Sequence, residues 1–377
     1  MRNYQEIEIW KNVQSADWNN WLWQERNTIR TVESLKKVIE LSEWEVNGIK
    51  EACKYLKMRI TPHIACLMDY NNPQDVIRKQ FIPTINETLS EDDIDLFSDV
   101  NADDRYAPVN GLVHRYPTKV LIFPTNYCGA YCRYCFRRKL NRDAETSLKN
   151  DELQNIFIYI RENTQINEVI LSGGDPLVLD DTKLEYIISE LSKIPHVRFI
   201  RIHTKMIITN PYRITDEFVD LLSKFKSRFP IFFVIHFDTV EEFSPPMRIA
   251  INKLVDNGFL CFASCPLLKG INDDEDKLKA LWTELLYLRV KPYYLFHSDP
   301  VKGLKHFMLP LKRGVEIMRN LYDRISGLSI PLYCFNIPDG GGHALIDYNN
   351  IKEIGVNKYL FHNFEGKEYI YNEPDFL

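Results

Sequence analysis

The sequence predicts an α/β fold: a partial (β/α)6 barrel of the TIM type, with an N-terminal helical segment and a short aromatic-rich C-terminal extension. From residue 119 onward, short apolar runs alternate with stretches in which apolar residues recur every three or four positions. The length of 377 residues suits one barrel-sized domain with an added segment. Repeated strand–helix units imply parallel strands, because each crossover between them needs a helix; a doubly wound open sheet is the alternative.

Six apolar runs are predicted to be the barrel strands. They span residues 119–125, 168–171, 197–203, 231–237, 260–268 and 292–296. The stretches between them have helical periodicity, and one of them has an apolar face formed by Leu153, Ile156, Phe157 and Ile160. In either fold, we expect functional side chains at the C-terminal ends of the strands.

Three parts are expected along the chain: a helical segment and linker (1–108), the barrel (109–345) and the extension (346–377). Within the first part, Ser42 and Glu45 have the spacing of a capping box ahead of a helix. Residues 90–108 are acidic and turn-rich, which favours a linker. The extension predicts strands packed on the domain through aromatic residues, namely Tyr359, Phe361, Phe364, Tyr369 and Tyr371.

Charge and hydropathy disfavour two classes of partner. The formal net charge is −5 and both signs are mixed along the chain, whereas nucleic-acid-binding surfaces carry a basic patch. No apolar run reaches the ~18 residues of a membrane helix, and the first ten residues lack the apolar stretch of a signal peptide. We therefore expect a cytoplasmic protein with reduced thiols and no nucleic-acid or membrane partner.

The chain has eight cysteines, and a disulfide framework is not expected in a reducing compartment. Five of them are scattered and are expected to be small core residues: Cys53, Cys66, Cys261, Cys265 and Cys334.

The other three cysteines, Cys128, Cys132 and Cys135, follow the first barrel strand with the spacing C-x3-C-x2-C. Three thiolates on one loop can hold three irons of a [4Fe–4S] cluster. The fourth iron is then open to the amino and carboxylate groups of S-adenosylmethionine (SAM). An electron passed to the sulfonium yields methionine and a 5′-deoxyadenosyl radical. The alternatives are a zinc site, which usually needs four ligands in two pairs, and a buried loop without metal.

A second motif, Ser172-Gly-Gly-Asp175, follows the second predicted strand. Gly173 and Gly174 allow the backbone to approach a ligand closely. Asp175 and free backbone groups are predicted to bind the SAM ammonium. The alternative is an ordinary tight turn from strand to helix.

With these motifs, the chain resembles the lysine 2,3-aminomutase family of radical SAM enzymes from residue 18 to about 347. The segments that carry the resemblance are 17–24, 111–117, 128–138, 172–175, 236–237, 267–273, 291–294, 298–299 and 337–342. The resemblance implies a partial radical SAM barrel and a flavodoxin or ferredoxin as electron donor.

The resemblance also implies roles for single residues. The three cysteines ligate the cluster, and the SAM contacts lie at Tyr134, Gly174, Asp175 and His236. Arg137 matches the residue that pairs with the substrate carboxylate, a task suited to a guanidinium fork. Contacts to pyridoxal phosphate (PLP) fall on Arg115, Tyr116 and Lys119. The alternative for each basic residue is a solvated charge or a surface ion pair.

The sequence departs from the family in three places. His343 stands at the cofactor position of the lysine that forms the PLP Schiff base, and an imidazole cannot form that imine. The glycines before it can still present N–H groups to an anion. Of the two acids that hold the distal ammonium in the lysine enzyme, Asp299 matches one and Asn336 replaces the other. A substrate less cationic than lysine is therefore expected. No cysteine follows Cys334, so the zinc-binding tail of the lysine enzyme is missing and homo-oligomerisation stays open.

The predicted function is a radical SAM enzyme that abstracts hydrogen from a small amino-acid-like substrate without PLP. The first alternative is a PLP-dependent amino acid 2,3-aminomutase with a relocated lysine, for which Lys302 and Lys305 are candidates. The second is a non-catalytic iron–sulfur or zinc protein that binds a partner. A macromolecular substrate stays open as well.

Overall fold

The computed structural model describes residues 1–88, 106–138, 145–322, 324–337, 342–346, 351–362 and 366–375, which form two compact units. The described residues of unit 1 lie within Met1–Thr88, Asn101–His236 and Glu241–Cys261, and those of unit 2 within Phe237–Val240 and Phe262–Leu377. Most of the predicted linker, the glycines before Gly342, and Phe364 fall outside the described residues. The three-part division predicted from the sequence stays a prediction.

Unit 1 begins with short helices, as predicted. They are α1 (Ser15–Trp18), α2 (Trp21–Arg26), α3 (Val32–Leu35), α4 (Glu43–Ala52), α5 (Pro62–Leu67) and α6 (Val76–Phe81), followed by the 3-10 turn η2 (Ile85–Glu87). The predicted capping box is confirmed, because the Glu45 N–H donates to Ser42 Oγ (3.2 Å) and the Ser42 N–H donates to Glu45 Oε2 (2.8 Å). Trp18 is buried and stacks on Tyr4, with ring centroids 4.0 Å apart.

The strands of unit 1 are neighbours in chain order. They are β1 (Leu112–Tyr116), β2 (Lys119–Ile122), β3 (Glu168–Leu171), β4 (Phe199–Thr204) and β5 (Ile231–His236). β1 pairs with β2 antiparallel, whereas β2 to β5 pair in parallel, each beside its predecessor. A doubly wound sheet reverses its strand order, so this order is that of the predicted barrel.

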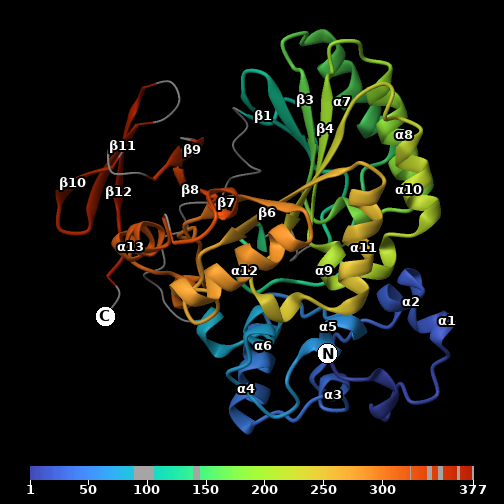
Figure 1. The fold of residues 1–377 in the computed structure, drawn as a ribbon, viewed down its shortest axis with the longest axis vertical. Coiled ribbons are helices and arrows are strands. Elements are labelled where there is room, and N and C mark those ends of the chain that lie inside the picture. Colours follow the sequence, from blue (N-terminus) through green and yellow to red (C-terminus); the bar gives the residue numbers. More distant parts are fainter. Residues whose placement is uncertain are drawn as a thin grey trace. The chain divides into compact units, whose positions relative to one another are not determined.

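Helices follow these strands along the chain (Figure 1). They are α7 (Asn150–Glu162), α8 (Asp181–Ser192), α9 (Met206–Thr209), α10 (Asp216–Ser223) and α11 (Pro245–Asp256). The apolar face predicted for α7 is buried. Along β4, Ile200 and Ile202 are buried while Arg201 and His203 are half-buried. Since alternate residues of a strand point to opposite faces, Arg201 and His203 lie on the face of β4 opposite to Ile200 and Ile202.

Unit 2 holds the last barrel strands and a separate sheet. Its elements are α12 (Glu275–Tyr287), β7 (Val290–Phe296), α13 (Leu311–Leu321), β8 (Leu332–Ile337), β9 (Gly342–Leu345), β10 (Ile351–Gly355), β11 (Lys358–His362) and β12 (Glu368–Asn372). β6 (Leu260–Pro266) contains residues of both units. β7 and β8 pair in parallel and β8 and β9 antiparallel, while β10, β11 and β12 form an antiparallel sheet. The aromatic extension thus contains strands, as predicted, and Tyr359, Phe361 and Tyr371 are buried.

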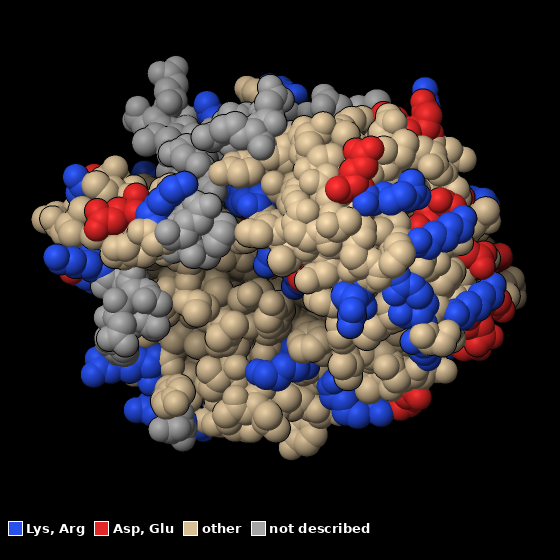
Figure 2. Space-filling view, turned by 90° about the horizontal axis from the view of Figure 1, so that it is seen from above, with Lys and Arg blue, Asp and Glu red and all other residues tan. Residues whose placement is uncertain are grey.

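Charges of both signs lie on the surface. Figure 2 shows one face, on whose right-hand part Lys and Arg side chains lie next to Asp and Glu. Exposed ion pairs of this kind include Lys224–Glu185 (2.9 Å) and Lys54–Glu51 (2.6 Å). Among the residues that the structure describes, no helix is long and apolar enough to cross a membrane.

Candidate functional site

The cysteine loop, which we define as residues 123–138, follows β2 at its C-terminal end. Backbone groups outside the loop hold it at both ends. The Tyr131 N–H donates to the Arg59 carbonyl (2.9 Å), the Arg133 N–H to the Gln80 carbonyl (2.8 Å), and the Asn126 N–H to the carbonyl of Thr146 (3.1 Å). The N-terminal helical segment therefore fixes the path of the loop that carries the three cysteines.

The three thiols of this loop form a donor set that needs positive charge. Burial raises the pKa of Cys128 well above its ordinary value, and the negative charges of Asp175, Cys135 and Cys132 raise it further, while Arg59 opposes the rise. Burial also raises the pKa of Cys135, against the Arg137 N–H and charge. Irons of a cluster would supply the charge that holds all three as thiolates, so the donor set fits a [4Fe–4S] cluster.

The described residues do not support a site for a single metal ion. Among them, no group of three Cys, His, Asp or Glu side chains is arranged to hold one ion. The three thiolates of an iron–sulfur cube each bind a different iron, so they need not converge on one point as the ligands of zinc do.

Two arginines of the loop meet on one buried carboxylate. Glu87, in η2, has a side chain that is only 2% exposed. Arg133 donates to it through Nε (2.9 Å to Oε1) and NH2 (2.6 Å to Oε2), and Arg138 NH2 donates to Oε2 (2.7 Å). Although burial raises the pKa of Glu87, the charge and hydrogen bonds of Arg133, and then Arg138, bring it below its ordinary value. This triad ties the second half of the cysteine loop to the N-terminal segment.

The two glycines after β3 lie against the backbone of the cysteine loop. A Cβ built on Gly174 would lie 2.2 Å from the Tyr127 carbonyl oxygen, and one on Gly173 would lie 2.7 Å from the Thr125 oxygen. Gly173 also has φ +103°, a conformation that favours glycine. The close approach predicted here exists, and its partner is the loop that precedes Cys128. The predicted contact of Gly173 and Gly174 with SAM stays a prediction.

Asp175 is buried and its carboxylate is surrounded by donors. Oδ1 accepts from the Leu177 N–H (3.0 Å), Oδ2 from the N–H groups of Lys205 (2.7 Å) and Met206 (2.9 Å), and Thr204 Oγ1 lies within 2.9 Å of both. Burial raises its pKa to about 6, against these hydrogen bonds. The carboxylate thus fastens the end of β3 to the end of β4, and its predicted contact with the SAM ammonium stays a prediction.

Tyr134 and His236 come together at the C-terminal end of β5. Their rings stack with centroids 5.7 Å apart. Sequence reasoning missed two neighbours: Lys205 Nζ lies 5.9 Å from the Tyr134 ring centroid and donates to buried Glu242 (2.6 Å). Lys205 follows directly on β4, which is the signal that could have revealed it. The structure therefore brings these two predicted SAM contacts together beside a buried ion pair.

Arg137 is held in one orientation by its neighbours. Its guanidinium carbon lies 4.8 Å from the ring centroids of both Phe123 and Phe136, and NH1 donates to Ser172 Oγ (2.9 Å). Contacts of this kind hold the plane of the guanidinium fork. The arrangement fits the predicted role of binding a carboxylate.

The residues predicted to contact PLP lie on and beside β1 and β2. The Arg115 guanidinium carbon lies 5.1 Å from the Tyr106 ring centroid, and its buried Nε has no hydrogen-bond partner among the described residues. Lys119 Nζ lies 4.2 Å from the Tyr116 ring centroid. Burial, and then the charge of Arg201, lower the pKa of Lys119.

Unit 2 holds the remaining candidates, Asp299, Asn336 and His343. Asn336 Nδ2 donates to both carboxylate oxygens of Asp299 (3.0 and 3.2 Å). His343 pairs with Asn336 across β8 and β9, and its exposed ring lies 5.2 Å from the Phe296 ring. No amine stands at position 343, so the residues there do not fit a PLP imine. The proposed substitutes, Lys302 and Lys305, are both exposed.

Comparison with known proteins shows the family to which the chain belongs. Residues 122–281 match the Radical SAM superfamily. The chain is 38% identical over 374 residues to the L-lysine 2,3-aminomutase of Bacillus subtilis, covering 99% of this chain and 78% of the relative. It is 39% identical to that of Clostridium subterminale (97% and 87% covered) and 37% identical to the glutamate 2,3-aminomutase of Clostridioides difficile (94% and 83% covered).

These findings confirm the predicted resemblance and the predicted fold class. Membership of the superfamily implies a [4Fe–4S] cluster and SAM as cofactors. The chain is an enzyme and belongs to the lysine 2,3-aminomutase family of radical SAM enzymes.

Proposed function

We propose that this enzyme uses a cluster on Cys128, Cys132 and Cys135 to abstract hydrogen from a small amino-acid-like substrate without a PLP imine at position 343. When bound, the cluster supplies the electron that splits SAM into methionine and a 5′-deoxyadenosyl radical. The observation that carries the proposal is the set of three half-buried thiols on one loop, Cys128, Cys132 and Cys135. Separately, in unit 2, His343 stands where the resemblance implies the imine-forming lysine. The relatives' names indicate amino acids as the substrate class.

Arg137 is proposed to bind the substrate carboxylate. Its fork lies against two phenyl rings and donates to Ser172, so little conformational freedom is lost when an anion binds. Charge-assisted, bidentate hydrogen bonds would orient the reacting carbon.

Tyr134, Gly173, Gly174, Asp175 and His236 are proposed to form the SAM side of the site. Tyr134 and His236 offer a stacked aromatic pair, and the glycines keep the backbone close to the cysteine loop. Asp175 is proposed to act through the backbone that it fastens, since each of its oxygens already accepts hydrogen bonds.

Asp299 and Asn336 are proposed to recognise the distal end of the substrate. The Asn336 amide already donates to both oxygens of Asp299, so an ammonium at the distal end of the substrate would compete with this amide for the carboxylate. The Asp299–Asn336 pair carries one negative charge, whereas the resemblance implies two acids at these positions in the lysine enzyme. We therefore propose a substrate with a neutral distal group, such as an amide or a hydroxyl.

A second candidate function is a PLP-dependent aminomutase that uses a different lysine. Lys119 favours it, because this amine is half-buried beside Tyr116, has a lowered pKa, and lies where the family contacts PLP. A neutral amine is the form that condenses with an aldehyde.

The deciding experiment is anaerobic incubation of cluster-loaded enzyme with SAM, a reductant and a panel of deuterated amino acids. Transfer of deuterium to 5′-deoxyadenosine would name both the substrate and the carbon. A Cys132→Ser variant, prepared in the same way, should give none. Cluster-loaded enzyme that forms no 5′-deoxyadenosine would contradict the proposal and favour a non-catalytic protein.

The PLP branch is tested with the same preparation. Addition of PLP and borohydride should leave no adduct if the enzyme works without an imine. A stable adduct that disappears in Lys119→Ala would establish the second candidate. A flavodoxin or ferredoxin as donor, a cytoplasmic location and homo-oligomerisation stay proposals that need tests of their own.

A further inference from the structure

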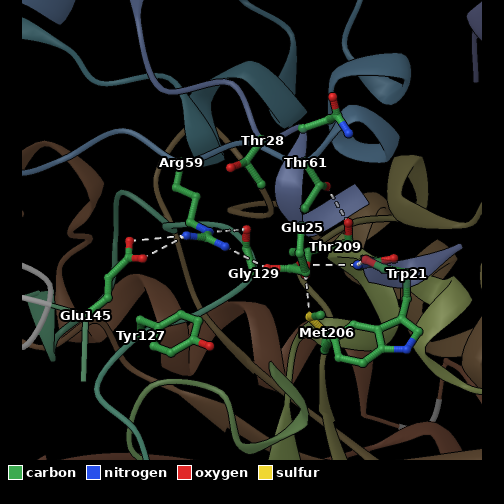
Figure 3. Close-up of polar contacts among 12 residues, drawn as sticks. Trp21, Glu25, Thr28, Arg59, Thr61, Tyr127, Gly129, Glu145, Met206 and Thr209 are labelled. Carbon is green, nitrogen blue, oxygen red and sulfur yellow. Dashed lines mark hydrogen bonds and ion pairs between the residues drawn. The ribbon is translucent and has the colours of Figure 1, made fainter. Parts of the chain in front are cut away.

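Arg59, on the N-terminal segment, makes its hydrogen bonds next to the first cluster ligand. Its side chain is only 4% exposed, and Nε donates to the carbonyl of Gly129, the residue after Cys128 (3.0 Å). NH2 donates to Glu25 (2.7 Å), and NH1 to both oxygens of Glu145 (3.2 and 3.1 Å). Figure 3 shows Glu145 and Glu25 on opposite sides of this guanidinium.

The surroundings leave Arg59 and Gly129 little freedom. A Cβ on Gly129 would lie 2.7 Å from Met206 Sδ and 2.8 Å from Glu25 Oε1, so a larger residue there would displace the ends of these two side chains. Tyr131, three residues after Cys128, also donates to Glu145 through its hydroxyl (2.8 Å). The Arg59–Glu145 ion pair therefore binds the chain at two points after Cys128: Arg59 holds the Gly129 carbonyl and Glu145 holds the Tyr131 hydroxyl.

The sign of a charge that acts on Cys128 matters for a cluster, and Arg59 is the positive charge that opposes the negative ones there. Reduction adds one negative charge to the cluster, and its potential responds to nearby charge and to hydrogen bonds. Arg59 is a buried cation beside this ligand, and its loss would leave Glu25, whose side chain is 12% exposed, against Gly129 without a counter-charge. Removing Arg59 should thus make reduction harder, whereas removing Glu145 should make it easier.

We infer that Arg59 is a positioning residue of the radical SAM site, which holds the peptide after Cys128 and raises the reduction potential of the cluster through its charge. This inference rests on the proposed ligation of the cluster by the three cysteines. Arg59 touches neither SAM nor substrate, and it acts through Gly129 and through the electric field at Cys128.

The test compares the cluster's midpoint potential in anaerobically reconstituted wild type, Arg59→Gln, Arg59→Lys, Glu145→Gln and Arg78→Gln. Arg78 is the matched control, since it is a similarly buried arginine whose side chain donates to Glu45, Asp69, Glu40 and Tyr70, which lie outside the cysteine loop. Both Gln replacements of arginine should lower the thermal stability. At one fixed potential, Arg59→Gln should lower the ratio of reduced to oxidised cluster at least tenfold, which is a shift of 59 mV for one electron.

The other variants fix the sign of the effect. Arg78→Gln should change the ratio less than twofold, Arg59→Lys should lie closer to wild type than Arg59→Gln, and Glu145→Gln should raise it. The inference is overturned if Arg59→Gln has the wild-type potential, or if its potential shifts in the same direction as that of Glu145→Gln. If Arg59→Gln does not fold, the absence of an upward shift in Glu145→Gln overturns it. A wild type that takes up no cluster contradicts the proposed function as well, which separates the two failures.

Discussion

Replacing Gly174 by alanine tests whether the turn after β3 sets the position of the cysteine loop. The new Cβ would lie 2.2 Å from the Tyr127 carbonyl oxygen and 2.6 Å from its backbone C and N atoms. Ordinary contact begins near 3.4 Å, so the backbone of Tyr127 must move by about 1.2 Å. Because these are backbone atoms, no side-chain rotation can relieve the contact.

The consequence should be larger for the cluster than for the fold. Overpacking of this kind costs about 1–3 kcal/mol in the free energy of unfolding. Ligand distances in a metal site tolerate about 0.2 Å, and Tyr127 directly precedes Cys128. We therefore expect Gly174→Ala to fold, to melt at a lower temperature, and to retain much less iron and sulfide after anaerobic reconstitution.

The assay is iron and sulfide content per chain with the visible spectrum of the cluster, alongside a urea titration. Gly327→Ala is the matched control, because a Cβ there would meet nothing within 4 Å. It should keep both the wild-type stability and the wild-type iron content. A Gly174→Ala protein that binds as much iron as wild type would refute the reasoning about the turn.

Further predictions concern the buried triad and the substrate contacts. Glu87→Ala leaves Arg133 and Arg138 buried without their carboxylate, so urea titration should show that the free energy of unfolding falls by about 3–5 kcal/mol. Glu51→Ala, which removes an exposed ion pair, should change it by less than about 0.5 kcal/mol. Equal losses in the two variants would contradict this prediction. Because the pKa of Glu87 is lowered in the folded protein, its ion pairs stabilise the fold above the ordinary pKa of 4.5 and are lost as pH falls through the lower, folded value. The free energy of unfolding should therefore decrease below about pH 4.5. In Glu87→Gln, this decrease of the free energy of unfolding with falling pH should be shallower. Arg137→Lys keeps the charge but loses the fork, and should raise the KM for the amino acid about tenfold or more, since charged hydrogen bonds contribute about 1.5–3 kcal/mol; an unchanged KM would rule out carboxylate binding there. Asn336→Asp adds a second acid beside Asp299, so the ratio of kcat/KM for lysine to that for a neutral analogue should rise, and a constant ratio would show that this pair does not read the distal group.

Much of the fold follows from local patterns in the sequence. The apolar face of α7 and the capping box at Ser42 depend on neighbours within one or two turns, and both are confirmed. Local patterns do not define where strands end: the run predicted to reach residue 125 ends at Ile122, because the chain turns there into the cysteine loop. β8 pairs with β9 and lies outside the six predicted strands, although most of its residues are apolar.

The candidate site shows the same division between local and distant information. The cysteines form a motif within eight positions, so their spacing alone predicts the cluster. Arg59, Glu25 and Glu87 lie far from that motif in the sequence and have no spacing of their own, so only the folded chain shows that they meet it. Asp175 is predicted from its place after a strand, but two of its three backbone donors come from the next strand end and cannot be read from the motif.

The most direct measurement of the central claim is the electron paramagnetic resonance spectrum of the reduced, anaerobically reconstituted protein with and without SAM. Three protein thiolates leave one iron for SAM, so we expect a [4Fe–4S] signal whose shape changes when SAM is added, and loss of that signal in Cys132→Ser. A protein that holds a single zinc ion, or a cluster signal that SAM does not alter, would contradict the account.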